Sequence, residues 1–280
     1  MAIKIVTDSL SDITADRAEE LGITIVPLTV IFGRETFLDR VTITTDEFYR
    51  RLADEDIWPT TTQPTPAAFV EIYEELAKET DEILVVTLSS KLSGTYQSAL
   101  SAKEMVKTKA RIEVIDSELV AMGLGLTIIS AVNKVNAGAS MDEMVEFVNK
   151  AKDRTHFVVY FDTLKYLAKG GRIGKAQGLL GSMLSVKPIL TLKDGEMAPV
   201  TRLRSKAAGM DYLYNVAGGA GSLEGLAVEH ATTPDEADRL VERLGDLYPK
   251  EQIVKAVISP VLGVHGGPGA MAITVLESEK

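Results

Sequence analysis

The chain has 280 residues, of which 45% are hydrophobic and 25% charged, a balance typical of a globular protein with one large or two ordinary domains. Its net charge of −10 argues against a protein that binds nucleic acid over much of its surface. The absence of cysteine excludes disulfides, thiol chemistry and cysteine-based zinc sites, and the three histidines are too far apart in the sequence to form a ligand-spacing motif.

The N-terminus has the pattern of a short strand and differs from that of a signal peptide. No apolar run reaches the ~18 residues that a bilayer-spanning helix needs. We therefore expect a cytoplasmic protein without a membrane span.

The first half of the chain alternates strands with helices. Short apolar runs predict strands at residues 3–7, 23–32, 36–38, 82–86 and 111–115. Capping residues, prolines and apolar periods predict helices that begin near Thr14, Thr44, Pro66, Tyr96, Val120 and Ser140. This βαβ alternation predicts a parallel sheet whose polar turns gather at one edge, in an N-terminal α/β domain of residues 1–153.

The second half is different, because it contains an antiparallel signal. Residues 186–192 and 197–201 flank Lys193-Asp194-Gly195, which predicts a β-hairpin. Further strands are predicted at residues 157–161, 226–229, 252–259 and 269–276, and helices at residues 164–173, 175–184, 205–216 and 234–247. We therefore expect a C-terminal mixed-sheet domain of residues 154–280.

A hydroxyl-rich turn joins the predicted strand at residues 82–86 to the helix that follows it. The turn carries Ser89, Ser90, Ser93 and Gly94, so hydroxyls and backbone N–H groups are aimed at one point near the positive end of a helix dipole. Such a turn is an anion site. The alternative is that Ser93 only caps the helix.

Two other segments combine polar side chains with prolines, which stiffen the backbone, or with glycines, which make it flexible. Thr61 and Thr62 lie in a loop stiffened by prolines, and their hydroxyls line it. The alternative is that this loop is only the turn that leads into the next helix. His265 is followed by a run of glycines and a proline, which lets the backbone approach a ligand closely. The alternative for His265 is a solvated histidine in a turn.

Basic residues are concentrated around Arg172 in an otherwise acidic chain. Lys165, Lys169, Lys175 and Lys187 are its basic neighbours in the sequence. Gly170 and Gly171 end a short helix, which exposes Arg172 to solvent. The segment is either a solvated face or a docking patch for a partner or a phosphate.

Taken together these segments resemble the DegV family of bacterial fatty-acid-binding proteins. The matching pieces run from end to end of the chain and read VTDS (6–9), TTQPTP (61–66), SSKLSGT (89–95), DS (116–117), YLAKGGRI (166–173), KPIL (187–190) and HGGPG (265–269). Each piece alone is weak, but the ordered set is specific. The resemblance implies two α/β domains with one fatty acid between them.

The resemblance also implies the site residues and a partner. It places the fatty acid carboxylate on Thr61, Thr62, Ser93, the backbone of Gly94 and His265. It implies that some members present this carboxylate to a separate ATP-using kinase, which makes an acyl phosphate, and that Arg172 meets the kinase and is not a fatty acid ligand. The expected protein is thus a lipid-binding protein without cofactor or metal. The acyl chain length is left open.

The sequence departs from the family pattern at two places. Thr62 replaces the usual serine and keeps a hydroxyl, whereas Ala121 and Met122 stand where a small polar residue often follows the turn at Asp116 and Ser117. The second difference puts a hydroxyl contact from that turn in doubt. The Asp8 and Asp116 turns are also weak candidates for a metal site, because lone carboxylates lack ligand spacing.

One alternative from another class remains, a serine hydrolase that acts on lipid esters. Ser93 would be its nucleophile and His265 its base. His-Gly-Gly is similar to an esterase oxyanion loop, but the Gly-x-Ser-x-Gly nucleophile elbow is missing around Ser93.

Overall fold

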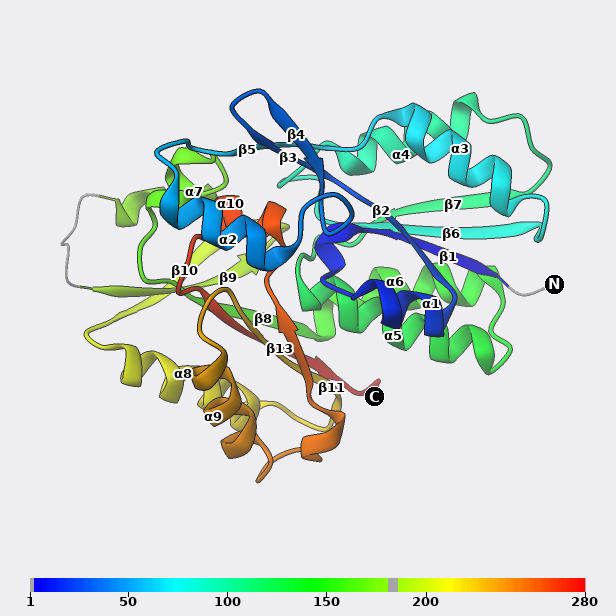
Figure 1. Cartoon of the computed structure of the whole chain (residues 1–280). Helices are drawn as coiled ribbons and strands as arrows, with labels where there is room; N and C mark the ends of the chain where they lie inside the picture. The colour runs from blue at the N-terminus through cyan, green and yellow to red at the C-terminus, as the bar shows by residue number, and fades with distance from the viewer. Residues whose placement is uncertain (1–2, 181–185, 280) are drawn as a thin grey trace.

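The computed structural model describes residues 3–180 and 186–279 and has the α/β architecture predicted from the sequence (Figure 1). The N-terminal half contains a parallel sheet with the strand order β2-β1-β6-β7. Its strands are β1 (Lys4–Asp8), β2 (Ile23–Val26), β6 (Glu82–Thr87) and β7 (Arg111–Asp116). The carboxyl ends of these strands carry the polar turns, as the βαβ pattern predicted.

Helices cover both faces of this sheet because its strands are apolar on both faces. One face packs against α3 (Pro66–Leu76) and α4 (Thr95–Met105), with Val85 in that core. The other face, which includes Leu84, packs against α1 (Ala15–Leu21), α5 (Met122–Asn136) and α6 (Met141–Arg154). Ser140 forms a reciprocal capping box with Glu143 at the start of α6, as predicted.

The single strand predicted over residues 23–32 is wrong. The segment forms two strands in different sheets, β2 and β3 (Thr29–Phe32), because Pro27 between them has no N–H to continue a ladder. β3 pairs with β4 (Glu35–Leu38) and with β5 (Thr60–Thr62) in a small antiparallel sheet beside α2 (Thr45–Asp54). The loop expected around Thr61 is therefore partly a strand.

The C-terminal half contains a mixed sheet with the strand order β10-β9-β8-β13-β11-β12. Each pair of neighbouring strands is antiparallel except the pair β11–β12, which is parallel. Its strands are β8 (Thr155–Tyr160), β9 (Lys187–Lys193), β10 (Glu196–Leu203), β11 (Leu223–His230), β12 (Val254–Val257) and β13 (Met271–Glu277). The predicted hairpin at Lys193-Asp194-Gly195 joins β9 to β10.

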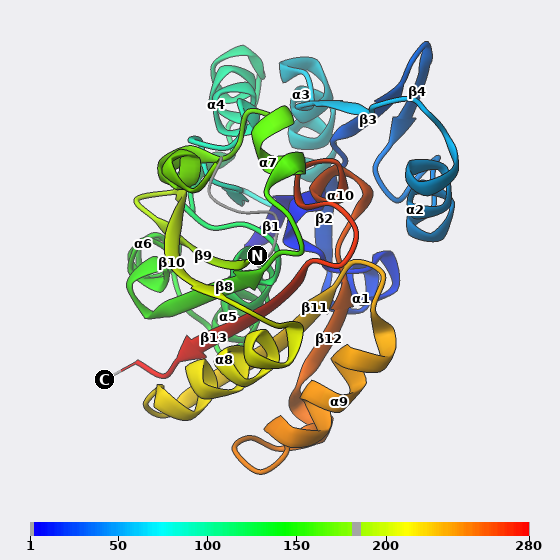
Figure 2. The same cartoon turned by 90° about the vertical axis from the view of Figure 1, so that its left-hand side faces the viewer.

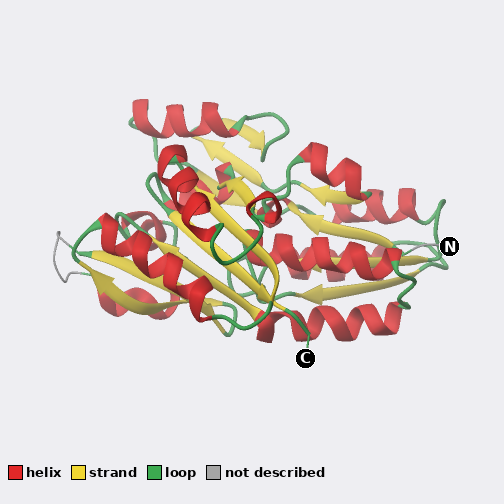
Figure 3. Ribbon diagram, turned by 90° about the horizontal axis from the view of Figure 1, so that it is seen from below, coloured by secondary structure: helices red, strands yellow, loops and turns green. Residues whose placement is uncertain are grey.

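The two faces of this mixed sheet have different neighbours. α8 (Lys206–Gly219) and α9 (Pro234–Leu244) cover one face, which Figures 2 and 3 show from two further directions. The opposite face looks toward α5, α6 and the parallel sheet, and its core continues into the core of the N-terminal half. Alternation along β8 divides the two environments: Val158 and Tyr160 belong to the outer core, whereas Phe157 and Val159 belong to the shared one.

Short elements complete the chain. They are α7 (Lys165–Lys169), α10 (Pro260–Gly266) and the 3-10 helices η1 (Ser9–Ser11), η2 (Gly174–Leu179) and η3 (Lys250–Gln252). The helix predicted over residues 175–184 is thus a 3-10 helix up to Leu179, and residues 181–184 lie outside the described residues. Over residues 3–180 and 186–279, no helix is long and apolar enough to cross a membrane.

Candidate functional site

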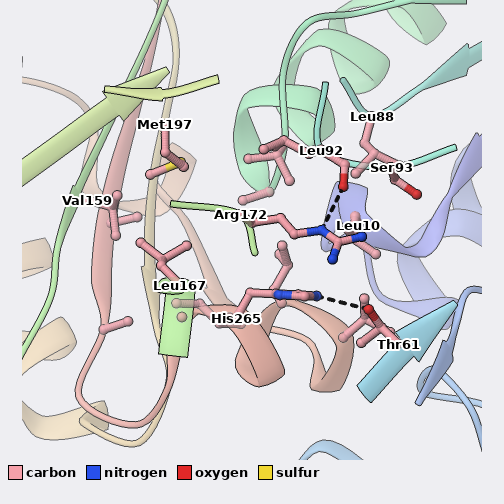
Figure 4. A pocket seen from close by; sticks show the side chains of 18 of the residues that line it. Leu10, Thr61, Leu88, Leu92, Ser93, Val159, Leu167, Arg172, Met197 and His265 are labelled. Carbon is pink, nitrogen blue, oxygen red and sulfur yellow. Dashed lines mark hydrogen bonds between the residues drawn. The ribbon is translucent and has the colours of Figure 1, made fainter. Parts of the chain in front are cut away.

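A cavity lies where the polar edge of the parallel sheet meets the inner face of the mixed sheet (Figure 4). Its volume is about 860 Å³, including the part that is open to solvent. The wall is mainly apolar and draws on both halves of the chain, with Leu88 and Val120 from the first half and Val159, Val261 and Ala272 from the second. The apolar character of the wall suits an organic ligand with a long apolar part.

Four of the five predicted carboxylate-binding residues line this cavity. Thr61 and Thr62 come from β5, Ser93 from the turn before α4 and His265 from the last turn of α10. They are separated by as much as 204 positions in the sequence. Gly94, the fifth residue, adjoins Ser93 but is not part of the lining.

His265 is held from two sides. Its Nε2 lies 2.9 Å from Thr61 Oγ1, while its Nδ1 is buried without a hydrogen-bond partner among the described residues. The Nδ1 side packs on Gly170, where an added Cβ would stand 2.2 Å from that nitrogen. Gly170 therefore has a steric reason to be glycine.

The imidazole of His265 is neutral near physiological pH. Burial, and secondarily the positive charge of Arg172, lower its pKa to about 4. A neutral imidazole has one N–H, and the tautomer with the proton on Nε2 donates it to Thr61 Oγ1. The hydroxyl hydrogen of Thr61 is then free to be donated to an anion in the cavity.

The segment that begins at His265 was predicted as a glycine-rich turn, and only the part after Gly266 is one. His265 itself is helical, and α10 ends at Gly266 with Gly267 as its C-cap, whose φ is 74°. The ring of Tyr166 fills the space where a Cβ at Gly267 would stand, 2.2 Å from its Cδ2. Tyr166 also stacks on Trp58 with the ring centroids 4.9 Å apart. Through Tyr166, α7 therefore contacts α10 and the segment that leads into β5.

Ser93 lies at the start of α4. Its Oγ accepts a hydrogen bond from the N–H of Thr95 at 3.3 Å and lies 2.9 Å from the hydroxyl of Thr95. The N-cap position itself is occupied by Gly94, which has no side chain to cap the helix, and Gln63 packs against it. Ser93 thus makes a local turn contact and also faces the cavity.

The pairing that a serine hydrolase would need is different from the one observed. Within the described part of the chain, His265 is hydrogen-bonded to Thr61, and no hydrogen bond joins it to Ser93. A base that activates a serine lies within hydrogen-bond reach of its hydroxyl.

Arg172 is exposed, as its position after the two glycines predicted, and it also lines the mouth of the cavity. Its Nε donates to the carbonyl of Leu92 at 3.1 Å and its Nη1 to the carbonyl of Gly170 at 2.7 Å. Figure 4 shows the guanidinium directed toward the side of the cavity that carries Thr61 and Ser93. The sequence had not indicated this proximity, because it depends on how α7 folds back over α10.

The two aspartate turns have structural roles. Asp8 accepts hydrogen bonds from the N–H groups of Leu10 at 3.0 Å and Leu88 at 2.7 Å. Asp116 accepts from the N–H of Ser90 at 3.0 Å, and Ser117 donates to the carbonyl of Thr87 at 2.7 Å. Among the described residues, no group of carboxylates and histidines has the arrangement of a metal site.

Glu229 on β11 is a lining residue that the sequence analysis missed. It is fully buried, and burial raises its pKa well above the usual value for a glutamate. The only signal in the sequence is its place directly after the apolar run Leu226-Ala227-Val228, where a charged residue is unusual.

The structure defines an α/β protein with a mainly apolar cavity between its two larger sheets, and comparisons with known proteins identify its family. A family model described as "Uncharacterised protein, DegV family" matches residues 2–278, and the chain belongs to the DegV family. A DegV domain-containing protein of Caldanaerobacter subterraneus is 36% identical over 97% of both chains. One from Staphylococcus aureus strain COL is 35% identical over 98% of both.

Solved structures give the same result. A DegV family protein from Thermus thermophilus, described as binding fatty acid, is 29% identical and matches with a TM-score of 0.92 over 99% of this chain and 100% of its own. DegV from Bacillus subtilis, described as a fatty acid binding protein, is 30% identical with a TM-score of 0.91 over the same shares. A stearic-acid-binding protein from Eubacterium ventriosum is 26% identical with a TM-score of 0.89 over 98% of both chains.

Proposed function

We propose that this protein binds one long-chain fatty acid, with the carboxylate at Thr61, Thr62, Ser93, Gly94 and His265 and the tail in the apolar cavity. The observation that carries the proposal is the asymmetry of the cavity: hydroxyls and a neutral imidazole gather at one end, while the rest of the wall is mainly apolar. The fatty acids named for similar DegV structures support it.

The two parts of the ligand have different energetic roles. Burying about fourteen methylene groups is worth roughly 11 kcal/mol before the costs of association. A carboxylate at the N-terminus of α4 gains only ~0.3–1 kcal/mol from the helix dipole, and each hydrogen bond to it about 1.5–3 kcal/mol. The tail therefore sets affinity, and the polar groups set orientation.

The direct test is the identity of whatever purifies with the protein. We expect solvent extraction and mass spectrometry to find a fatty acid in stoichiometric amount. The delipidated protein should then take up added palmitate. Fresh protein that contains no fatty acid and takes up none would overturn the proposal.

We further propose that the bound carboxylate is presented to a partner kinase that uses ATP. In this reaction a carboxylate oxygen attacks the γ-phosphorus of ATP, the bond from that phosphorus to ADP breaks, and an acyl phosphate remains on the fatty acid. The carboxylate end of the cavity is the end that opens to solvent beside Arg172, which suits a reaction with a group on another protein. Arg172 docks the kinase in this proposal.

Arg172→Ala tests the docking role. Fatty acid content should stay near the wild-type level, while acyl-phosphate formation with the cognate kinase falls sharply. Arg172→Lys should restore only part of the activity, since lysine cannot reproduce bidentate contacts. Arg239→Ala, at an exposed arginine on α9, is the matched control. Normal turnover in Arg172→Ala would remove the docking role, and loss of fatty acid would place Arg172 in the lipid site instead.

A further inference from the structure

A buried seam of carboxyl groups lies behind the cavity, where η1, α5 and β11 meet. Asp12 ends η1, and Glu229 on β11 faces it from the other half of the chain. The two carboxyl groups are within hydrogen-bonding reach of one another, and both residues are almost completely buried, at 2% and 0% exposure. Two carboxylates offer only acceptors, so a hydrogen bond between them requires that one holds a proton.

The surroundings show which carboxyl holds it. Asp12 Oδ1 lies 3.2 Å from Nη2 of Arg40 and accepts from the N–H of Ser259 at 3.3 Å, so Asp12 is the better anion. Glu229 Oε1 accepts from the N–H of Met122 at 3.0 Å. If both carboxyls are ionised, Asp12 Oδ2 and Glu229 Oε2 have no hydrogen-bond donor among the described residues. A proton on Glu229 gives the two oxygens a hydrogen bond to each other.

The other titratable groups that face the pair do not supply a positive charge that would let both carboxyls be ionised. Asp8 on β1, Asp39 after β4 and Tyr49 on α2 lie in the same seam. Arg40 is the cation that interacts with Asp12, Asp39, Tyr49 and Glu229. Asp12, Asp39 and Glu229 around one guanidinium cannot all be ionised in a buried site without a large desolvation cost.

The pair is connected to the wall of the cavity through Ala121. This residue lines the cavity and has φ 56° and ψ −148°, a conformation that residues other than glycine adopt only when their surroundings impose it. Glu229 imposes it by holding the N–H of the next residue, Met122. Gly125 brings α5 so close to η1 that an added Cβ would touch the carbonyl of Ser11, which keeps Asp12 in the same unit.

We propose that Asp12 and Glu229 share one proton, and that this bond, acting through the N–H of Met122, positions the cavity wall at Ala121 against which the acyl tail packs. The effect on the ligand rests on the proposed fatty acid binding. Loss of the proton leaves two adjacent anions, which separate and release the N–H of Met122. Fatty acid affinity then falls as the pH rises, and a bound tail in turn favours the protonated pair.

Glu229→Gln is the decisive variant, because its amide donates permanently to Asp12 and its carbonyl still accepts from Met122. We expect palmitate affinity of the wild type to drop about tenfold between about pH 7 and about pH 9, as for a group whose pKa differs by about one unit between free and loaded protein. Affinity of Glu229→Gln should stay level over the same range. Glu251→Gln, at an exposed glutamate on η3, should follow the wild type.

Infrared spectroscopy supplies a readout that does not depend on the ligand. At about pH 8 the spectrum of the wild type should contain the C=O stretch of a protonated carboxylic acid, and this band should lose most of its intensity in Glu229→Gln and keep it in Glu251→Gln. Identical bands in wild type and Glu229→Gln would overturn the shared proton, and identical pH profiles would overturn its effect on the cavity. If no variant binds palmitate at any pH, the proposed function fails, and the band alone then decides the shared proton.

Discussion

At the scale of single residues, the candidate head-group site depends on hydroxyl groups whose hydrogens are directed by their neighbours. The neutral imidazole of His265 lies beside the hydroxyl of Thr61, and the hydroxyl of Ser93 lies beside that of Thr95. A carboxylate accepts from such hydroxyls without requiring a proton change in the protein.

Ser93→Ala should weaken binding of a fatty acid by about 10- to 100-fold, because it removes one hydrogen bond to a charged acceptor worth about 1.5–3 kcal/mol. Binding of the corresponding methyl ester, which has no charge, should change much less. Competition titrations with palmitate and methyl palmitate measure the difference. Equal losses for both ligands would mean that the change acts through the fold, and hydrolysis of the ester by the wild type alone would favour a serine hydrolase.

Gly170→Ala should displace the imidazole of His265, since the new Cβ would stand 2.2 Å from Nδ1. We expect palmitate affinity to fall about 2- to 10-fold, the effect of weakening one hydrogen bond of about 0.5–1.5 kcal/mol. Gly219→Ala is the control, because nothing lies within 4 Å of the added atom at that position. Wild-type affinity in Gly170→Ala would show that the position of His265 is unimportant for binding.

At the scale of elements, the mixed sheet provides a cavity wall through simple alternation. On β13 Ala272 faces the cavity, whereas Met271 and Ile273 pack under α8 and α9. Small side chains on the inner face leave room for the ligand, while large ones on the outer face fill the core.

Ala272→Leu should shorten the fatty acids that the protein selects. The three added carbons occupy space that the tail would fill, so we expect the mean chain length of extracted ligands to fall by about two to four carbons. Met271→Leu, on the opposite face of the same strand, conserves volume and should leave the ligand profile unchanged. Mass spectrometry of the ligands from both variants tests this. An unchanged profile in Ala272→Leu would mean that the tail does not reach β13.

At the scale of the whole molecule, the buried carboxyl groups between the two sheets govern the response to pH. Burial raises the pKa of Asp8 and of Asp39 to about 7, although both accept hydrogen bonds that lower it. The unfolded chain releases these protons near pH 4, so the folded state holds more protons between about pH 4 and about pH 7.

The free energy of unfolding should therefore decrease as the pH rises from about 5 to about 7.5, because Asp8 and Asp39 hold protons in the folded state that the unfolded chain has released. His265, whose folded pKa is about 4, acts in the opposite direction only up to about pH 6.5 and is one group against two. Urea midpoints at several pH values in this range measure the trend at constant ionic strength. Glu55, Glu79 and Glu113 are paired carboxylates with lowered pKa values that act mainly below about pH 4.5, and solvent screening keeps their effect small. A midpoint that rises from pH 5 to 7.5 would contradict the protonated seam.

The sequence alone determined the elements whose signals are local. The parallel βαβ order, the hairpin at Asp194-Gly195, the capping box at Ser140 and the helix stop at Gly170 were all predicted from a few adjacent residues, and the structure contains them. These features depend on backbone geometry and on side chains within one turn, which a sequence records directly.

The tertiary structure decided what depends on contacts between distant segments. It split residues 23–32 between two sheets, brought Thr61 to His265, placed Arg172 at the mouth of the cavity and paired Asp12 with Glu229. No local pattern contains these outcomes, because alternation along a strand shows that it has two different faces but not what each face meets. Burial then changes the chemistry: the same carboxyl that would be ionised in water keeps its proton between the two sheets.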